Sequence, residues 1–120
     1  MSRLAPPPVV LAVAGTDSGG AAGLAADLTT IADLGAHGAC VVTAVTAQDT
    51  AAVHAVHALP ATMVAAQLDA VLDDLPVAGV KTGMLGSAEV VTLVAERLGG
   101  RGIPLVVDPV LVATCGAVLG

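Results

Sequence analysis

The fold is decided by one stretch near the start of the chain, VVLAVAGTDSGGAAGLAADL, which spans residues 9–28. Its first six residues are all apolar, as in a strand that is buried on both faces of a parallel sheet. A glycine-rich turn, Gly15–Gly23, follows, and residues 24–34 then predict a helix that stops at Gly35. Strand, glycine-rich turn and helix in this order begin an α/β domain.

The rest of the chain alternates between strands and helices in the same way. Short apolar runs predict strands at residues 40–45, 77–81 and 103–107, the last one buried. A weakly alternating run at residues 53–59 predicts a short strand outside the main sheet. Strands that alternate with helices predict a mostly parallel sheet with flanking helices and right-handed crossovers.

Two further helices are predicted between these strands, each with one apolar face. The first begins at Pro60, stops at Pro76 and has an apolar stripe made of Val64, Leu68, Val71, Leu72 and Leu75. The second is capped by Ser87, stops at Gly99, and has an apolar face made of Val90, Val91, Val94, Ala95 and Leu98. Both faces are expected to pack on the sheet.

The composition excludes several classes of partner. The 120 residues carry a net charge of −6 with only four Lys and Arg, and they include no Phe, Tyr or Trp. Such a chain cannot neutralise several phosphates or stack on bases, which excludes nucleic acid. An anionic membrane is excluded for the same lack of positive charge. No uncharged apolar run is long enough for a transmembrane helix.

The chain is also very apolar for its size. Hydrophobic residues make up 56% of it, against roughly 45–50% in soluble domains. A partner subunit or a further piece of sheet would cover the excess, and the sheet looks unfinished at Gly120. Cys40 and Cys115 lack metal-ligand spacing and are expected to be free thiols of a cytoplasmic protein.

Polar or glycine-rich segments follow the predicted strands. Ligands of open α/β sheets bind at the carboxyl ends of the strands, where the expected segments are Gly15–Gly23, Thr46–Thr50, Lys81–Gly86 and Asp108–Gly116. The first segment lacks the G-x-G-x-x-G spacing and the Gly-Lys-Ser/Thr ending of phosphate loops. Its glycines permit either close approach of a ligand or a tight structural turn.

Two aspartates in these regions are candidate binding residues. Asp27 shares a helical face with Leu24 and Ile31, so it must be paired, hydrogen-bonded or kept for a ligand. It could accept a hydrogen bond from an aminopyrimidine, or it could bond to nearby backbone. Asp108 directly follows a strand and precedes a proline, which suits either a Mg²⁺ ligand or a turn.

Gln48 and Met84 are the other candidates. The amide of Gln48 can donate and accept at once, as the edge of an aminopyrimidine requires, although a surface position is the alternative. Met84 could form a soft wall over a ring or simply belong to the core. The histidines, His37, His54 and His57, lack the spacing of a metal site or a triad and are expected to be solvated or hydrogen-bonded.

Several segments, taken together and in order, resemble the hydroxymethylpyrimidine/phosphomethylpyrimidine kinases of thiamine biosynthesis. The segments are AGTDSGG at 14–20 with ADL at 26–28, TAVTAQ at 43–48, VAAQLD at 64–69, VKTGML at 80–85 and VDPV at 107–110. The resemblance covers nearly the whole chain and implies the ribokinase-like α/β fold that this family shares with pyridoxal kinases. Residues 1–8 would be an irregular tail, and residues 9–120 the N-terminal portion of the kinase domain.

The resemblance also implies an activity and a set of site residues. The family transfers the γ-phosphoryl group of ATP to 4-amino-5-hydroxymethyl-2-methylpyrimidine and then phosphorylates the monophosphate. By the match, the pyrimidine would be lined by Gly15, Asp27, Gln48, Met84 and Val110. Asp108 would lie near Mg²⁺ and the phosphates, and the full-length family suggests a homodimer. The catalytic residue and most of the ATP pocket are expected beyond Gly120.

The chain departs from the family pattern at a few positions. Thr114-Cys115 stands where the family usually has Lys-Ser, Asp49 replaces a usual Asn, and Thr29 a usual Lys. The first two changes make the expected site more acidic. Alternatives are therefore an inactive truncated fragment that at most binds the pyrimidine, and a pyridoxal-type kinase of the same superfamily. A dinucleotide-binding module is more distant, because the glycine spacing is wrong.

Overall fold

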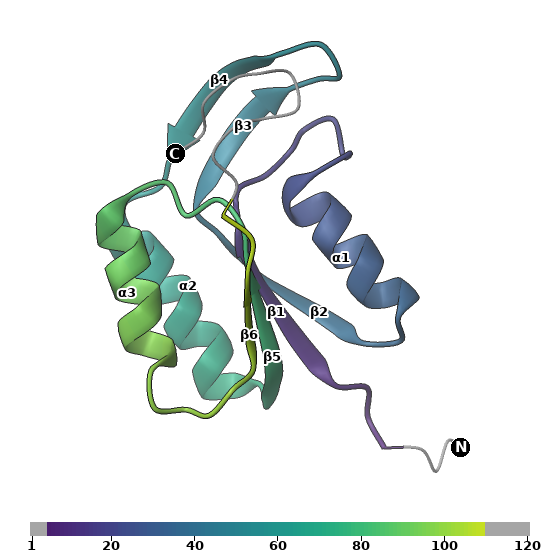
Figure 1. The fold of residues 1–120 in the computed structure, drawn as a ribbon, viewed down its shortest axis with the longest axis vertical. Helices are drawn as coiled ribbons and strands as arrows, with labels where there is room; N and C mark the ends of the chain where they lie inside the picture. Colours follow the sequence, from purple (N-terminus) through teal and green to yellow (C-terminus); the bar gives the residue numbers. More distant parts are fainter. Residues whose placement is uncertain (1–4, 110–120) are drawn as a thin grey trace.

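The computed structural model describes residues 5–109, in which three helices and six strands form three layers (Figure 1). The elements in chain order are β1 (Val9–Ala14), α1 (Gly23–Asp33), β2 (His37–Val42), β3 (Ala44–Gln48), β4 (Val53–Ala58), α2 (Ala61–Asp74), β5 (Val77–Thr82), α3 (Ala88–Leu98) and β6 (Leu105–Val107). The main sheet has the order β2-β1-β5-β6, and all of its neighbouring strands are parallel. This confirms the predicted α/β class.

The core is divided by the sheet into two unequal parts. Leu11 and Val13 of β1 face α2 and α3, where they pack with Val64, Leu68 and Val94. The alternate residues of β1 face α1, and there the side chains are small, Ala12 and Ala14 packing with Leu24 and Ile31. Figure 1 shows α1 alone on one face and the other two helices on the opposite face. Burial on both faces explains why β1 is a continuous apolar run.

The second strand differs from the sequence prediction. A single strand was expected at residues 40–45, but β2 ends at Val42 and β3 begins at Ala44. Between them lies Thr43, a buried bend whose hydroxyl donates to the carbonyl oxygen of Met84 at 2.7 Å. The bend takes the chain out of the main sheet into the antiparallel β3–β4 hairpin, which confirms the predicted strand outside the main sheet. An apolar run on both sides of the bend gave no sign of it.

Two predictions about apolar faces were wrong. In α3, Val90 and Val94 are buried as expected, but Val91 is half exposed and Ala95 is exposed, because the buried face of the helix is narrower than the predicted stripe. The last strand, β6, is not buried either: it is three residues long, all of them exposed. It lies at the edge of the described sheet, so apolar composition alone overstated its burial.

A side chain of α2 satisfies part of one edge of the main sheet. At the β2 edge, the side-chain amide of Gln67 in α2 accepts from the backbone N–H of Val42 at 2.8 Å and donates to its carbonyl oxygen at 2.9 Å. These bonds satisfy backbone groups that a sheet edge leaves free.

Within residues 5–109, every helix is too short or too polar to serve as a transmembrane span. Cys40 is a free, exposed thiol, as expected.

Candidate substrate site

Gly15 and Met84 meet where β1 and β5 end. Gly15 follows β1 directly, and a Cβ atom at this position would overlap the terminal methyl group of Met84. Met84 is 7% exposed, and its backbone carbonyl oxygen accepts a hydrogen bond from the hydroxyl of Thr43. Glycine at position 15 therefore lets the methionine lie against the end of β1, so two of the predicted site residues are in contact.

The glycine-rich loop after β1 is organised by the carboxylate of Asp17. Its oxygens accept hydrogen bonds from the backbone N–H groups of Gly19 at 2.8 Å, Ala21 at 3.1 Å and Ala22 at 2.8 Å. Asp17 is 8% exposed, so these bonds compensate for the burial of its charge. Because an internal carboxylate already occupies these N–H groups, the loop is a structural turn and not a phosphate cradle.

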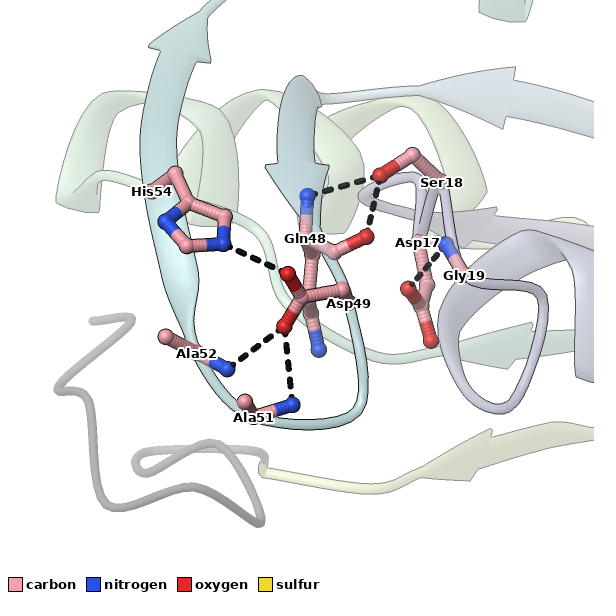
Figure 2. Close-up of polar contacts among 8 residues, drawn as sticks. All are labelled: Asp17, Ser18, Gly19, Gln48, Asp49, Ala51, Ala52 and His54. Carbon is pink, nitrogen blue, oxygen red and sulfur yellow. Dashed lines mark hydrogen bonds and ion pairs between the residues drawn. The ribbon is translucent and has the colours of Figure 1, made fainter.

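This loop is also joined to strand β3. The backbone N–H of Thr46 donates to the hydroxyl of Thr16 at 2.9 Å, and the Thr46 hydroxyl donates to the carbonyl oxygen of Thr16 at 2.7 Å. Further out, the backbone N–H of Gln48 donates to the hydroxyl of Ser18 at 2.6 Å, and this hydroxyl donates back to the Gln48 carbonyl oxygen (Figure 2). Gln48 is half-buried, and its backbone is fixed beside the first loop.

Asp27 is paired with a residue that the sequence analysis did not single out. The ammonium group of Lys81, in β5, lies 2.9 Å and 3.0 Å from the two carboxylate oxygens of Asp27, in α1. The side chains are 26% and 16% exposed, respectively. The inward position predicted for Asp27 is therefore confirmed. Its partner lies 54 residues away, so no local pattern could reveal it.

Asp49 forms a second polar cluster next to Gln48. One carboxylate oxygen accepts from the backbone N–H groups of Ala51 and Ala52 at 2.8 Å and 2.9 Å, and the other lies 2.7 Å from Nε2 of His54 (Figure 2). The His54 hydrogen bond, followed by those two N–H groups, lowers the pKa of Asp49 to about 2. The contact with Asp49 confirms that His54 is hydrogen-bonded. The bonds to Ala51 and Ala52 show that Asp49 stabilises the hairpin turn.

Asp108 directly follows β6, at the carboxyl end of the main sheet. Its backbone N–H donates to the carbonyl oxygen of Thr82 at 2.9 Å, and the residue is exposed. No group of three or more His, Cys, Asp or Glu side chains suited to a metal ion occurs in residues 5–109. A Mg²⁺ ion here would thus rely on one carboxylate together with phosphates and water, which is a common arrangement for this ion. Val110, Thr114 and Cys115 lie outside the described residues.

A hollow of about 330 Å³ lies beside Met84, between β5, β6 and the start of α3. Its lining includes Val91, Val107 and Thr82. The hydroxyl of Thr82 is buried and has no hydrogen-bond partner within the part of the chain that the structure describes. Neither Asp27 nor Gln48 lines this hollow. The predicted residues thus surround one end of the sheet, with only Gly15 and Met84 in direct contact.

Comparison with solved structures shows which proteins share this fold. A crystal structure of phosphomethylpyrimidine kinase from Clostridium difficile matches with a TM-score of 0.83 and 41% identity, over 93% of this chain and 49% of that one. The pyridoxal kinase of Staphylococcus aureus, solved with pyridoxal, matches with a TM-score of 0.81 and 34% identity, over 90% of this chain and 41% of that one. The fold of this chain is therefore ribokinase-like, and the chain spans less than half the length of each of these two kinases.

The sequence matches narrow the class to one family. The family model described as phosphomethylpyrimidine kinase matches residues 17–120. The hydroxymethylpyrimidine/phosphomethylpyrimidine kinase of Streptomyces coelicolor is 55% identical over 113 residues, which are 94% of this chain and 42% of that protein. The chain belongs to the phosphomethylpyrimidine kinase family, and it spans less than half the length of this relative.

Proposed function

We propose that the protein takes part in the ATP-dependent phosphorylation of 4-amino-5-hydroxymethyl-2-methylpyrimidine and of its monophosphate, and that this chain supplies the pyrimidine-binding part. The observation that carries the proposal is that the Gly15–Met84 contact and the Asp27–Lys81 pair both lie towards the carboxyl ends of β1 and β5, in a chain of this family. We extend the proposal to a cytoplasmic location, where ATP is available, and to a homodimer, which the apolar composition would suit.

Each residue has a distinct role in this proposal. Gly15 lets the Met84 side chain lie against the end of β1, and Met84 there forms an apolar wall for the ring. The carboxylate of Asp27 accepts a hydrogen bond from the 4-amino group, and the amide of Gln48 donates to and accepts from the edge of the ring. Val110 would add to the apolar lining.

Asp108 is the residue proposed to hold Mg²⁺ or its water shell. It is exposed at the carboxyl end of β6, where phosphates can approach. Mg²⁺ with ATP would supply the phosphoryl group and neutralise its charge during transfer. The chain's own residues then bind and orient the pyrimidine, which is how positioning contributes to such reactions.

Ligand-dependent stability tests the substrate. Because the chain has no aromatic residue, unfolding is followed by far-UV circular dichroism and not by intrinsic fluorescence. The hydroxymethylpyrimidine at 100 times its Kd should raise the free energy of unfolding by about 2.7 kcal/mol, and pyridoxal at the same concentration should raise it less. ATP-dependent formation of the phosphorylated pyrimidine by the purified protein is measured in parallel.

Pyridoxal is the second candidate substrate, because the pyridoxal kinase of S. aureus shares the fold of this chain at 34% identity. Stabilisation by pyridoxal alone would show that the substrate is assigned wrongly. Binding of the pyrimidine without turnover would favour the alternative of a non-catalytic binding fragment. Stabilisation by neither compound would overturn the proposed function.

A further inference from the structure

We propose that Lys81 is a positioning residue for the ligand: it holds the carboxylate of Asp27 in an orientation in which the carboxylate can accept a hydrogen bond from the amino group of the pyrimidine. This inference rests on the proposed function, and it adds a residue that none of the comparisons assigns. Both carboxylate oxygens lie within 3.0 Å of the single ammonium group, so Lys81 restrains the carboxylate through two hydrogen bonds.

The ion pair leaves hydrogen-bonding capacity on the carboxylate of Asp27. An ionised carboxylate offers about four lone-pair directions, and Lys81 uses one on each oxygen. The remaining lone pairs of Asp27 have no other hydrogen-bond donor among the described residues. An ammonium group has three N–H bonds, of which Asp27 takes two. The pair can therefore bind a further donor without being broken.

The ammonium group of Lys81 also lies near the backbone at Gly83. A Cβ atom placed on Gly83 would lie 3.2 Å from Nζ of Lys81 and 3.2 Å from the methyl of Ala14. Glycine at position 83 therefore leaves the space that the ammonium group needs, one residue before Met84.

Burial distinguishes this ion pair from the others. Of the three pairs within residues 5–109, the Lys81–Asp27 pair is the least exposed, at 26% and 16%. The Arg97–Asp69 pair between α3 and α2 is exposed by 35% and 47%. Buried pairs are seldom more stabilising than apolar residues of similar size, so holding α1 against the sheet does not require two charges. Placement at the carboxyl end of the sheet favours a role in binding.

The experiment measures discrimination between two ligands in several variants of the protein. The ligands are the hydroxymethylpyrimidine and an analogue in which hydrogen replaces the 4-amino group, and binding is measured by equilibrium dialysis. The wild-type protein should bind the amino compound roughly 10–100-fold more tightly, the value of one charge-assisted hydrogen bond. In Lys81→Met this ratio should fall below about 3-fold, because the carboxylate is no longer fixed. Lys81→Arg, which keeps the charge, should restore much of the ratio.

Two further variants keep the test decisive. Arg97→Met removes the Arg97–Asp69 ion pair, which joins α3 to α2 and does not involve the sheet, and it should leave the ratio unchanged. If Lys81→Met does not fold, Lys81→Gln still donates to the carboxylate without carrying charge, and it should also lower the ratio. A protein that binds neither ligand would overturn the proposed function itself. If Lys81→Met or Lys81→Gln binds the two ligands with the wild-type ratio, Lys81 does not have the proposed role. The proposed function would then still stand.

Discussion

Asp49 shows how one side chain can stabilise a turn and carry a pH-dependent interaction at once. One oxygen binds the N–H groups of Ala51 and Ala52, and the other binds His54 across the hairpin. The pKa of Asp49 falls from an ordinary value of 3.8 to about 2, chiefly because of the His54 hydrogen bond. Both side chains are more than half exposed, so water and salt weaken the interaction.

Stability should therefore depend on Asp49 in a defined pH range. Because the folded-state pKa lies below the unfolded value, the carboxylate stabilises the fold fully above about pH 4, and this contribution disappears as the pH falls towards 2. Asp49→Asn keeps an oxygen for Ala51 and Ala52 but loses the charge. The melting temperature of the wild type should exceed that of the variant at pH 5, and the difference should vanish near pH 2. Thermal melts from pH 2 to 6 measure this, and a constant difference would contradict it.

Among single residues, the sequence could reveal only those whose position depends on neighbours close in the chain. The spacing of Asp27 from Leu24 and Ile31 was enough to place its carboxylate on the inward face of α1, because helical periodicity is a local property. Its partner Lys81 could not be inferred, since β5 is brought beside α1 only by the order of strands in the sheet. Likewise, nothing local indicated that Asp17 would bind the N–H groups of its own loop.

At the scale of elements, α1 begins in an unusual way. Its N-cap, Ala22, makes no side-chain hydrogen bond, and the free N–H groups before the helix are bound by Asp17 instead. The first residue, Gly23, has φ of +57° and passes so close to β1 that a Cβ atom would lie 2.6 Å from the carbonyl oxygen of Gly15. The helix can therefore start here only with glycine.

Replacing the glycines at the two ends of α1 separates steric contact from backbone strain. Gly35, after the helix, has φ of +84°, and a Cβ there would meet nothing within 4 Å. Gly35→Ala should cost about 1–2 kcal/mol through the positive φ alone. Gly23→Ala should cost a further 1–3 kcal/mol, roughly, because backbone atoms block the methyl group. Urea unfolding followed by circular dichroism measures both, and equal losses would show that the close contact is unimportant.

Element boundaries were predictable where local chemistry sets them. The oxygen of Ser87 accepts from the N–H of Val90 at 3.2 Å, as its position before α3 predicted, and β1 and β5 begin where expected. The bend at Thr43 was missed because its causes are long-range, above all the bond from Thr43 to Met84. The burial of β6 was overestimated for a similar reason, since an apolar run does not show which neighbours a strand has.

At the scale of the whole molecule, part of the apolar excess of the sequence lies exposed on β6. Leu105, Val106 and Val107 of β6 are 48%, 65% and 60% exposed, and within residues 5–109 this strand pairs with β5 alone. Parallel strands are normally covered on both faces. The composition indicated that something further should cover the chain. The strand order places β6 at one edge of the sheet, where all three of its residues are exposed, and β2 at the other edge, where Gln67 binds the backbone of Val42.

An exposed apolar edge of this kind should make the protein associate with itself. Open strands offer free N–H and carbonyl groups to another chain, and charged residues on such edges prevent this. Leu105→Lys places a charge on β6, whereas Val56→Lys places the same charge on the hairpin strand β4, at an equal 48% exposure in the wild type. In sedimentation velocity over a range of concentrations, we expect Leu105→Lys to weaken self-association by about 10-fold or more, and Val56→Lys to have little effect. The opposite pattern would place the contact on the β3–β4 hairpin, and a wild-type protein that stays monomeric would show that the β6 edge is already protected.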